Sequence, residues 1–260
     1  MFIQKNKIMN TNNIKDPTSK VFPFGKDLGG TIIETKNISR IYHQGDIKVK
    51  ALNDVSISFN QGEFTAIIGP SGSGKTTFLN AVGGLDTPTS GQVIINNTDI
   101  TKLKENELID FRLNNIGFVF QAYNLIPVLT AKENVEFIML MQEKSKKERE
   151  ERAVKLLTEV GLSTQINRRP NQLSGGQQQR VAVARALASK PKFVLADEPT
   201  ANLDSVSTNN LLDIMQTLNK EEGMTFIFST HDQRVIDRAN RIITLEDGKV
   251  LSDVIMFNEE

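Results

Sequence analysis

Apolar and polar positions along the chain fall into two patterns: short, nearly continuous apolar runs, and longer stretches with one apolar face. The short runs have the length of strands. Strands are therefore predicted over Ala51–Phe59, Phe64–Ile68, Gln92–Ile95, Lys192–Ala196, Thr225–Ser229 and Arg241–Leu245. In the first of these the residues alternate, which places Val55, Ile57 and Phe59 on one face.

The longer stretches predict helices, and one of them, Thr130–Val160, contains two possible helix starts in which Ser or Thr is followed three residues later by Glu, the capping-box pattern. These two starts are Thr130–Glu133 and Ser145–Glu148. Helices are predicted over Gly74–Val82, Thr130–Val160, Gln178–Ala188, Leu211–Leu218 and Val235–Ala239. Strands that alternate with helices indicate an α/β fold with a mostly parallel core sheet.

Composition narrows the class of protein. The 260 residues suit one large domain, or a domain with a subdomain, and Lys plus Arg balance Asp plus Glu at 31 each. This balance argues against a nucleic-acid-binding protein, and the absence of cysteine excludes a disulfide scaffold, a cysteine-zinc site and a thiol nucleophile. No apolar run reaches the roughly 18–20 residues that span a bilayer. Residues 1–30 are interpreted as a flexible N-terminal extension, with a docking tail as the alternative.

A glycine-rich segment between a predicted strand and a predicted helix fits the pattern G-x-x-x-x-G-K-[ST]. Consecutive backbone N–H groups in such a loop, and the start of the following helix, favour bound phosphate oxygens. Lys75 is predicted to reach the β- and γ-phosphates, and the Thr76 hydroxyl to ligate Mg²⁺. The segment consists of Gly69, Pro70, Ser71, Gly72, Ser73, Gly74, Lys75 and Thr76.

Two carboxylates follow the apolar run that ends at Ala196. An acid at the carboxyl end of a parallel strand lies beside the crevice where ligands bind in open α/β sheets. Asp197 is predicted to hold Mg²⁺, directly or through water, and Glu198 to act as general base for an attacking water. Two solvated loop carboxylates are the alternative interpretation.

A second candidate anion site precedes the predicted helix Gln178–Ala188. The hydroxyl of Ser174 and the amides of Gly175, Gly176 and Gln177 would lie at a helix N-terminus. A simple N-cap with a turn explains the same residues. However, Leu173–Gln177 has the form of the signature of the ABC (ATP-binding cassette) family and lies shortly before the paired carboxylates, as in that family. The resemblance covers about residues 32–250.

The resemblance implies roles for further residues. Tyr42 resembles the aromatic residue that stacks on adenine, and Gln121 the glutamine that senses Mg²⁺ and the attacking water. Asp204 resembles a residue of the loop that crosses to the partner subunit, and both Asp204 and Thr77 are predicted to bind the nucleotide. His231 resembles the switch histidine that contacts the γ-phosphate, which gives a catalytic set of Lys75, Gln121, Glu198 and His231. Each of these residues has an alternative interpretation. Tyr42 could be a half-exposed strand aromatic, Gln121 a polar loop residue, and His231 a neighbour of a helix N-cap.

The family fold implied is a P-loop NTPase-like core with a mostly parallel sheet, an antiparallel β region and an α-helical subdomain. The ABC ATPase domain would span residues 31–260, with the helical subdomain at about 122–178. The nucleotide would be ATP with Mg²⁺, clamped between two copies of the chain, so that Ser174 of one copy closes over the phosphate loop of the other.

Several stretches are similar to the subgroup that contains MacB, LolD and the cell-division ABC ATPases. They are Gly83–Gly91, Ile116–Gln121, Asn124–Pro127, Thr130–Val135 and Gly175–Arg180. This similarity implies a separate integral-membrane permease of the MacB or FtsX type, export or extraction of a substrate, and a peripheral location at the cytoplasmic face of the inner membrane. Signalling through a permease to cell-wall enzymes is the alternative. A cassette acting on DNA or ribosomes would need a coiled-coil insertion or a second cassette.

Overall fold

The computed structural model describes residues 8–10, 29–45 and 47–256, which form two compact units. The first unit is built from the segments up to Lys102 and from Ile227 onward, and the second from Leu103–Phe226. Most of the expected N-terminal extension lies outside the described residues. Its described part, β1 (Ile8–Asn10), pairs antiparallel with β12 (Lys249–Met256).

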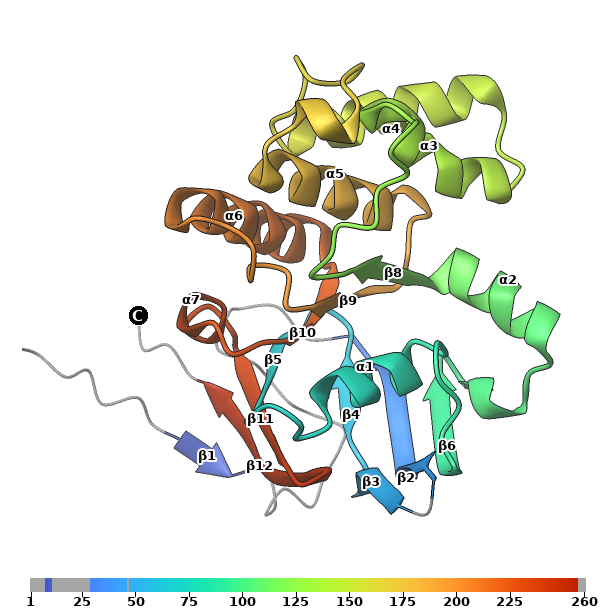
Figure 1. Cartoon of the computed structure of the whole chain (residues 1–260), viewed down its shortest axis with the longest axis vertical. Coiled ribbons are helices and arrows are strands. Elements are labelled where there is room, and N and C mark those ends of the chain that lie inside the picture. The colour runs from blue at the N-terminus through green and yellow to red at the C-terminus, as the bar shows by residue number, and fades with distance from the viewer. Residues whose placement is uncertain (1–7, 11–28, 46, 257–260) are drawn as a thin grey trace, which may run out of the picture. The chain divides into compact units, whose positions relative to one another are not determined.

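In the first unit, a sheet with the order β1-β12-β11-β5-β10 carries the phosphate loop (Figure 1). The strand β5 (Phe64–Ile68) runs parallel to β11 (Arg241–Glu246), which pairs antiparallel with β12. β10 (Thr225–Ser229) begins in the second unit and ends in the first. The rings of Phe64 and Phe228 lie 4.6 Å apart in the core, so the apolar runs of β5 and β10 are buried as predicted.

A second sheet in the first unit is antiparallel and confirms the expected antiparallel β region. It contains β2 (Thr31–Gln44), β3 (Ile47–Val55), β4 (Ser58–Asn60), β6 (Ser90–Ile95) and β7 (Thr98–Asp99). The single strand predicted over Ala51–Phe59 is wrong, because β3 ends at Val55, just after Asp54 adopts a left-handed φ of 60°, and β4 begins at Ser58. At the break, Thr35 donates its backbone N–H to the Ile57 carbonyl, and its hydroxyl oxygen accepts the Ile57 N–H.

Helix α1 (Lys75–Val82) covers the first unit's core with one apolar face, made of Phe78, Leu79, Ala81 and Val82. The ring of Phe78 lies 6.2 Å from that of Phe59 in the antiparallel region. The short helices η2 (Ile100–Lys102) and α7 (Gln233–Ile236) complete this unit. The strand–loop–helix order around the phosphate loop is confirmed.

The second unit has a parallel strand pair beside a group of helices. β8 (Ile116–Val119) pairs with β9 (Phe193–Asp197), and α2 (Glu105–Asn115) precedes β8. Helix α6 (Ser205–Glu222) extends beyond the predicted Leu211–Leu218, because Asp204 caps its start and Gly223, at a left-handed φ of 67°, ends it.

The remaining helices of the second unit are α3 (Ala131–Met141), α4 (Lys146–Glu159), α5 (Gly175–Ala188) and the short η3 (Pro170–Gln172). α3, α4 and α5 lie side by side (Figure 1). Both predicted capping boxes, at Thr130 and Ser145, are present, and they divide the predicted helical stretch into α3 and α4. No helix among the described residues is long and apolar enough to cross a membrane.

Candidate functional site

The phosphate loop follows β5 directly and has the backbone that the motif predicts. Gly69, with a φ of 148°, stands where a Cβ would lie 2.0 Å from the Leu245 carbonyl oxygen, so no other residue fits without movement of the backbone. The loop is closed by the Ser73 N–H, which donates to the Pro70 carbonyl at 3.2 Å. The buried Ser73 hydroxyl has no hydrogen-bond partner among the described residues. This loop can therefore offer polar groups to a ligand.

Lys75 lies at the first position of α1 and folds back over the loop. Its Nζ donates to the carbonyl oxygens of Gly69 at 2.8 Å and Pro70 at 3.0 Å. The N-cap of α1 is Gly74, no side chain caps this end, and no acid lies in the first turn. The start of the helix thus presents backbone N–H groups and the positive end of the helix dipole, which fits an anionic ligand. Thr76 is exposed and Thr77 half-buried in this turn.

His231 follows the end of β10, at the same edge of the sheet as the phosphate loop. β10 neighbours β5 in the strand order, and the Thr230 N–H donates to the Ile67 carbonyl at 3.1 Å. His231 itself is exposed, and the next residue, Asp232, caps α7. The first unit therefore brings the phosphate loop and His231 to neighbouring strand ends.

Tyr42 lies on β2 and is half-buried, as the strand-aromatic alternative also required. Its hydroxyl donates to Asp86 Oδ2 at 2.6 Å, and the guanidinium carbon of Arg40 stands 4.7 Å from the ring centroid. Sequence reasoning assigned no role to Arg40 or to Asp86, although Asp86 lies in the stretch Gly83–Gly91 that resembles the subgroup.

In the second unit, Asp197 is the last residue of β9 and Glu198 follows it with a left-handed φ of 46°. A non-glycine residue in this region carries backbone strain of the kind found at functional sites. Both carboxylates are half-buried. No group of three or more His, Cys, Asp or Glu in the described part of the chain could hold a metal alone. Mg²⁺ is commonly held by one or two carboxylates together with substrate phosphates.

The helix that follows the signature segment starts earlier than predicted, at Gly175 instead of Gln178. Ser174 is its N-cap: the hydroxyl oxygen accepts the Gln177 N–H at 3.3 Å, and the Gln177 side chain accepts the Ser174 N–H at 3.0 Å. Ser174 is exposed, so its cap role leaves it accessible. A Cβ on Gly176 would lie 2.6 Å from the Ser207 hydroxyl, which explains the glycine by close approach.

Among the predicted site residues of the second unit, Gln121 and Asp204 are connected to this helix start through Asn202 and Ser207. The Asn202 side chain donates to the Gln121 carbonyl at 3.1 Å. The Asn202 carbonyl oxygen would lie 3.7 Å from a Cβ on Gly175. Asp204 caps α6 by accepting the Ser207 N–H at 2.9 Å, and this hydrogen bond is the main reason why its pKa is lowered. Ser207 thereby connects Asp204 to Gly176.

Two further residues of this cluster were missed by sequence reasoning. The hydroxyl of Tyr123 lies where a Cβ on Gly175 would clash, and partial burial raises the pKa of this hydroxyl. Arg185, on α5, donates to the carbonyl oxygens of Tyr123 and Asn124 and so holds the segment after Gln121. An arginine at an otherwise apolar position of the helix was the only signal in the sequence.

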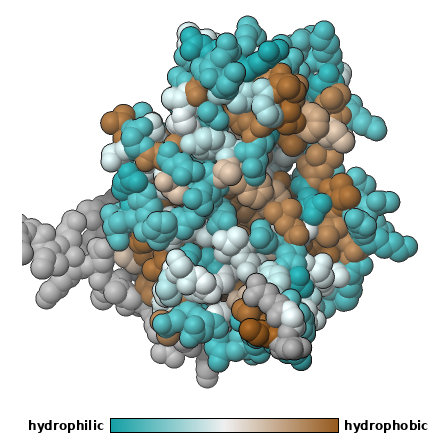
Figure 2. Space-filling model, in the orientation of Figure 1, coloured by the Kyte–Doolittle hydropathy of each residue, from teal (hydrophilic) through white to brown (hydrophobic). Residues whose placement is uncertain are grey.

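An apolar groove of about 360 Å³ lies next to Arg185, between β8 and α3. Hydrophobic side chains gather over this region in Figure 2, and Phe137, Leu140 and Met141 of α3 are 38%, 50% and 55% exposed. The groove is lined mainly by Ile116, Phe118, Phe120, Ile126, Phe137 and Ile138.

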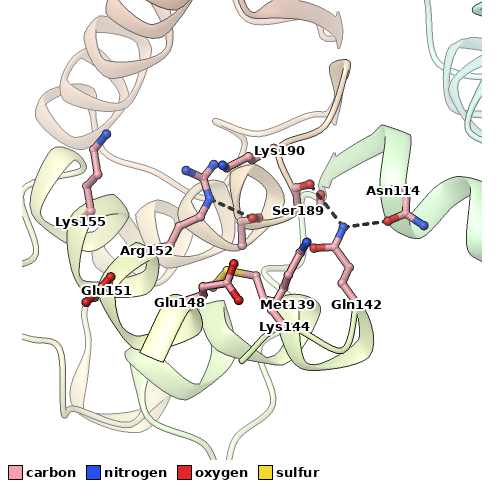
Figure 3. A pocket seen from close by; sticks show the side chains of 11 residues that line it. Asn114, Met139, Gln142, Lys144, Glu148, Glu151, Arg152, Lys155, Ser189 and Lys190 are labelled. Carbon is pink, nitrogen blue, oxygen red and sulfur yellow. Dashed lines mark hydrogen bonds between the residues drawn. The ribbon is translucent and has the colours of Figure 1, made fainter. Parts of the chain in front are cut away.

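A larger cavity of about 470 Å³ in the second unit contains none of the predicted site residues. Figure 3 shows that structural contacts cross it: Gln142 Nε2 donates to Asn114 Oδ1 at 3.0 Å, and Arg152 Nε to the Ala188 carbonyl at 3.0 Å. Burial lowers the pKa of Arg152. These contacts fasten helix ends to one another, so the cavity is structural.

A phosphate loop between a parallel strand and a helix, in an α/β fold, defines a P-loop nucleoside triphosphatase. Comparison with known proteins narrows this class. The family described as ABC transporter matches residues 52–201. An uncharacterized ABC transporter ATP-binding protein of Methanocaldococcus jannaschii is 48% identical over 220 residues, which cover 85% of this chain and 98% of the relative. The chain belongs to the ABC transporter family as an ATP-binding, ATP-hydrolysing subunit.

Two other similarities refine the picture. A Macrolide export ATP-binding/permease protein MacB of Hyphomonas neptunium is 46% identical over 222 residues, which cover 85% of this chain but 34% of that longer protein. A dimeric ATP-binding cassette solved in a post-hydrolysis state with ADP and Pi has a TM-score of 0.82 and 44% identity, with 88% of this chain and 100% of that chain covered. The predicted fold and the MacB-like resemblance are confirmed.

Proposed function

We propose that two copies of this chain clamp ATP with Mg²⁺ between them and hydrolyse it to drive a separate integral-membrane permease. The observation that carries the proposal is the phosphate loop, whose uncapped helix start and folded-back Lys75 suit a triphosphate. Export or extraction of a substrate is favoured, because the MacB relative is named for macrolide export. The site of action would be the cytoplasmic face of the inner membrane, where the chain would be peripheral.

The nucleotide would be held first by residues of the phosphate loop. Within Gly69–Thr76, in which Pro70 has no N–H, the other backbone N–H groups, followed by that of Thr77, would bind phosphate oxygens. Lys75 would exchange its carbonyl partners for the β- and γ-phosphates. Tyr42 would stack on the adenine.

The second copy would complete the site. Ser174, Gly175, Gly176 and Gln177 would donate to the γ-phosphate bound by the other copy, and Asp204 would lie near it. Three observations support this: Ser174 is exposed, its neighbours start a helix, and the solved relatives are dimeric. Because ATP would contact both copies and ADP would lose one set of contacts, hydrolysis would weaken the dimer.

Hydrolysis would use the acidic end of β9. Glu198 would accept a proton from the attacking water, and Gln121 and His231 would orient that water and the γ-phosphate. Mg²⁺, when bound, would neutralise phosphate charge, with Thr76, Asp197 and Gln121 as its protein-side ligands. The exposed Thr76 hydroxyl in the first turn of α1 and the half-buried Asp197 fit this role.

The permease would be contacted by the helical subdomain at about residues 122–178. The groove between β8 and α3 is the surface that fits an apolar helix of a membrane protein, because apolar side chains line it and Phe137 among them is exposed. Co-purification from native membranes tests the partner. A permease with an extracellular docking module for cell-wall enzymes would point instead to the signalling role.

The test of the clamp uses Glu198→Gln. This variant is expected to bind ATP, hydrolyse it at least about a hundredfold more slowly and elute as a dimer from gel filtration with ATP, because it keeps the contacts but loses the base. Glu221→Gln, at an exposed position of α6, is the matched control and should behave as wild type. If Glu198→Gln stays monomeric with saturating ATP, the two-copy site is wrong. Lys75→Ala should bind neither ATP nor tripolyphosphate measurably.

A further inference from the structure

The side chains around Tyr42 form a closed network on the first unit. The Tyr42 hydroxyl donates to Asp86 Oδ2 at 2.6 Å. Arg40 makes a bidentate ion pair with the same carboxylate, with Nε 2.9 Å from Oδ2 and Nη2 2.6 Å from Oδ1. The Arg40 guanidinium also stands over the Tyr42 ring, 4.7 Å from its centroid. Ring face and hydroxyl are thus held by two different groups.

Asp86 is itself fixed from two sides. Its backbone N–H donates to the Asn80 carbonyl, in α1, at 3.2 Å. The turn that carries it is bound to β2, because the Thr89 N–H donates to the Ser39 carbonyl at 2.8 Å and the Thr89 hydroxyl oxygen accepts the Ile41 N–H at 3.0 Å. The carboxylate therefore connects the helix that starts at Lys75 to the strand that carries Tyr42.

The contacts among Arg40, Asp86 and Tyr42 differ from those of an ordinary exposed ion pair, because they can fix the position of the Tyr42 ring. The side chains of Arg40 and Asp86 are only 26% and 21% exposed, so both are partly withdrawn from water. Bidentate arginine–carboxylate pairs fix geometry as well as charge, and a cation over an aromatic face holds the ring plane. An isolated exposed pair would do neither.

We infer that Arg40 and Asp86 are positioning residues that hold the Tyr42 ring for nucleobase stacking, which rests on the proposed ATP site. Arg40 covers one face of the ring, so the base would stack on the opposite face. Because the hydroxyl is bound to Asp86, Tyr42 contributes its ring face and not a hydrogen bond to the base edge. Loss of either support would weaken the base contact and leave the phosphate contacts intact.

The test separates the base from the phosphates. Binding of a fluorescent ATP analogue to the full chain is competed with unlabelled ATP and, separately, with inorganic tripolyphosphate, which has no base. Tyr42→Ala should weaken ATP competition at least about fivefold, since base–aromatic stacking accounts for roughly that much or more. Asp86→Ala should weaken it about threefold, and neither variant should change tripolyphosphate competition.

A matched control and a coupling measurement exclude a merely structural effect. Asp99→Asn alters another carboxylate of this unit that is 16% exposed and paired with Lys102, and should change neither competition. Tyr42→Phe removes only the hydroxyl, so it should weaken ATP competition in the wild-type chain and have no further effect in Asp86→Ala. Asp86→Asn replaces Asp86→Ala if the latter does not fold.

The outcomes distinguish this inference from the proposed function. Equal weakening of ATP and tripolyphosphate by Asp86→Ala, no change in either, or additive effects of Tyr42→Phe and Asp86→Ala would overturn the positioning role. Failure of the wild-type chain to bind ATP, or retained binding by Lys75→Ala, would instead overturn the nucleotide site itself.

Discussion

The most buried charge cluster of the first unit gives a sharp stability prediction. Glu63 is 1% exposed and accepts hydrogen bonds from Arg241 Nη1 at 2.9 and 3.2 Å, from the N–H and side-chain amide of Asn60 at 3.0 Å, and from the Thr65 hydroxyl at 2.9 Å. Arg241 also pairs with Asp253 at 2.6 Å. Burial alone would lower the pKa of Arg241, but Glu63 and Asp253 together raise it.

Glu63→Gln keeps the shape of the side chain and removes its charge. Of the groups that contact Glu63, only the Thr65 hydroxyl can also accept a hydrogen bond. The new amide N–H₂ must therefore either face another donor or donate to Thr65, and in the second case one hydrogen bond from Arg241 is lost. Losing one hydrogen bond to a charged group costs about 1.5–3 kcal/mol, and leaving a buried charge without a partner costs about 3–5 kcal/mol. Because Asp253 still pairs with Arg241, we expect a loss of about 3 kcal/mol.

Urea unfolding followed by circular dichroism measures this loss. Glu34→Gln is the matched control, because Glu34 pairs with Lys36 at 3.1 Å with both side chains more than 40% exposed, and should lose less than about 0.5 kcal/mol. A loss below about 1 kcal/mol for Glu63→Gln would refute the reasoning. It would mean that water, or movement of Arg241, replaces the lost contacts.

Three further predictions follow from the local geometry. Gly69→Ala should abolish binding of a fluorescent ATP analogue and lower the melting temperature, because its Cβ would meet the Leu245 carbonyl; unchanged binding would contradict this. The pKa of Glu133 is lowered from 4.5, chiefly by the hydrogen bond from the Thr130 N–H. The ionised Glu133 carboxylate therefore stabilises the folded state above pH 4.5, and this stabilisation is lost as the pH falls below that value. The stability difference between wild type and Glu133→Gln should therefore shrink on acidification, and a constant difference would count against it. Asn134 is fully buried, and its side chain makes four hydrogen bonds to backbone groups, so Asn134→Ala should cost at least about 2 kcal/mol by thermal unfolding. A loss under about 1 kcal/mol would show that water substitutes for the amide.

The parts of the fold predicted from sequence are those with a strong local signal. β5 and β10 were predicted with correct bounds because each contains a run of apolar residues that is almost entirely buried. The capping boxes at Thr130 and Ser145 were predicted because their chemistry lies within four residues. The phosphate loop combined a motif with the required strand and helix, so its local structure followed from sequence alone.

The parts that were missed lack such a signal. β12 has one buried residue, Ile255, and α2 has none, so neither shows an apolar period. The early start of α5 was missed because Gly175 and Gly176 are poor helix formers, although the capping box of Ser174 and Gln177 compensates. For the candidate site, motifs predict the residues that would bind the nucleotide, but no motif indicates the residues that contact them. Arg40, Asp86 and Arg185 act through contacts across about 45 or more positions of sequence, which no local pattern reveals.

The folded-back position of Lys75 also affects how the phosphate loop would release its nucleotide. Since the ammonium already has two carbonyl acceptors, an arriving phosphate exchanges one set of acceptors for another, and the net gain is smaller than the new contacts alone suggest. The same carbonyls are ready to receive the ammonium again when the phosphate leaves. Because the ammonium has acceptors in both conditions, the net affinity of the loop for phosphate is lowered, which disfavours tight retention of a bound nucleotide.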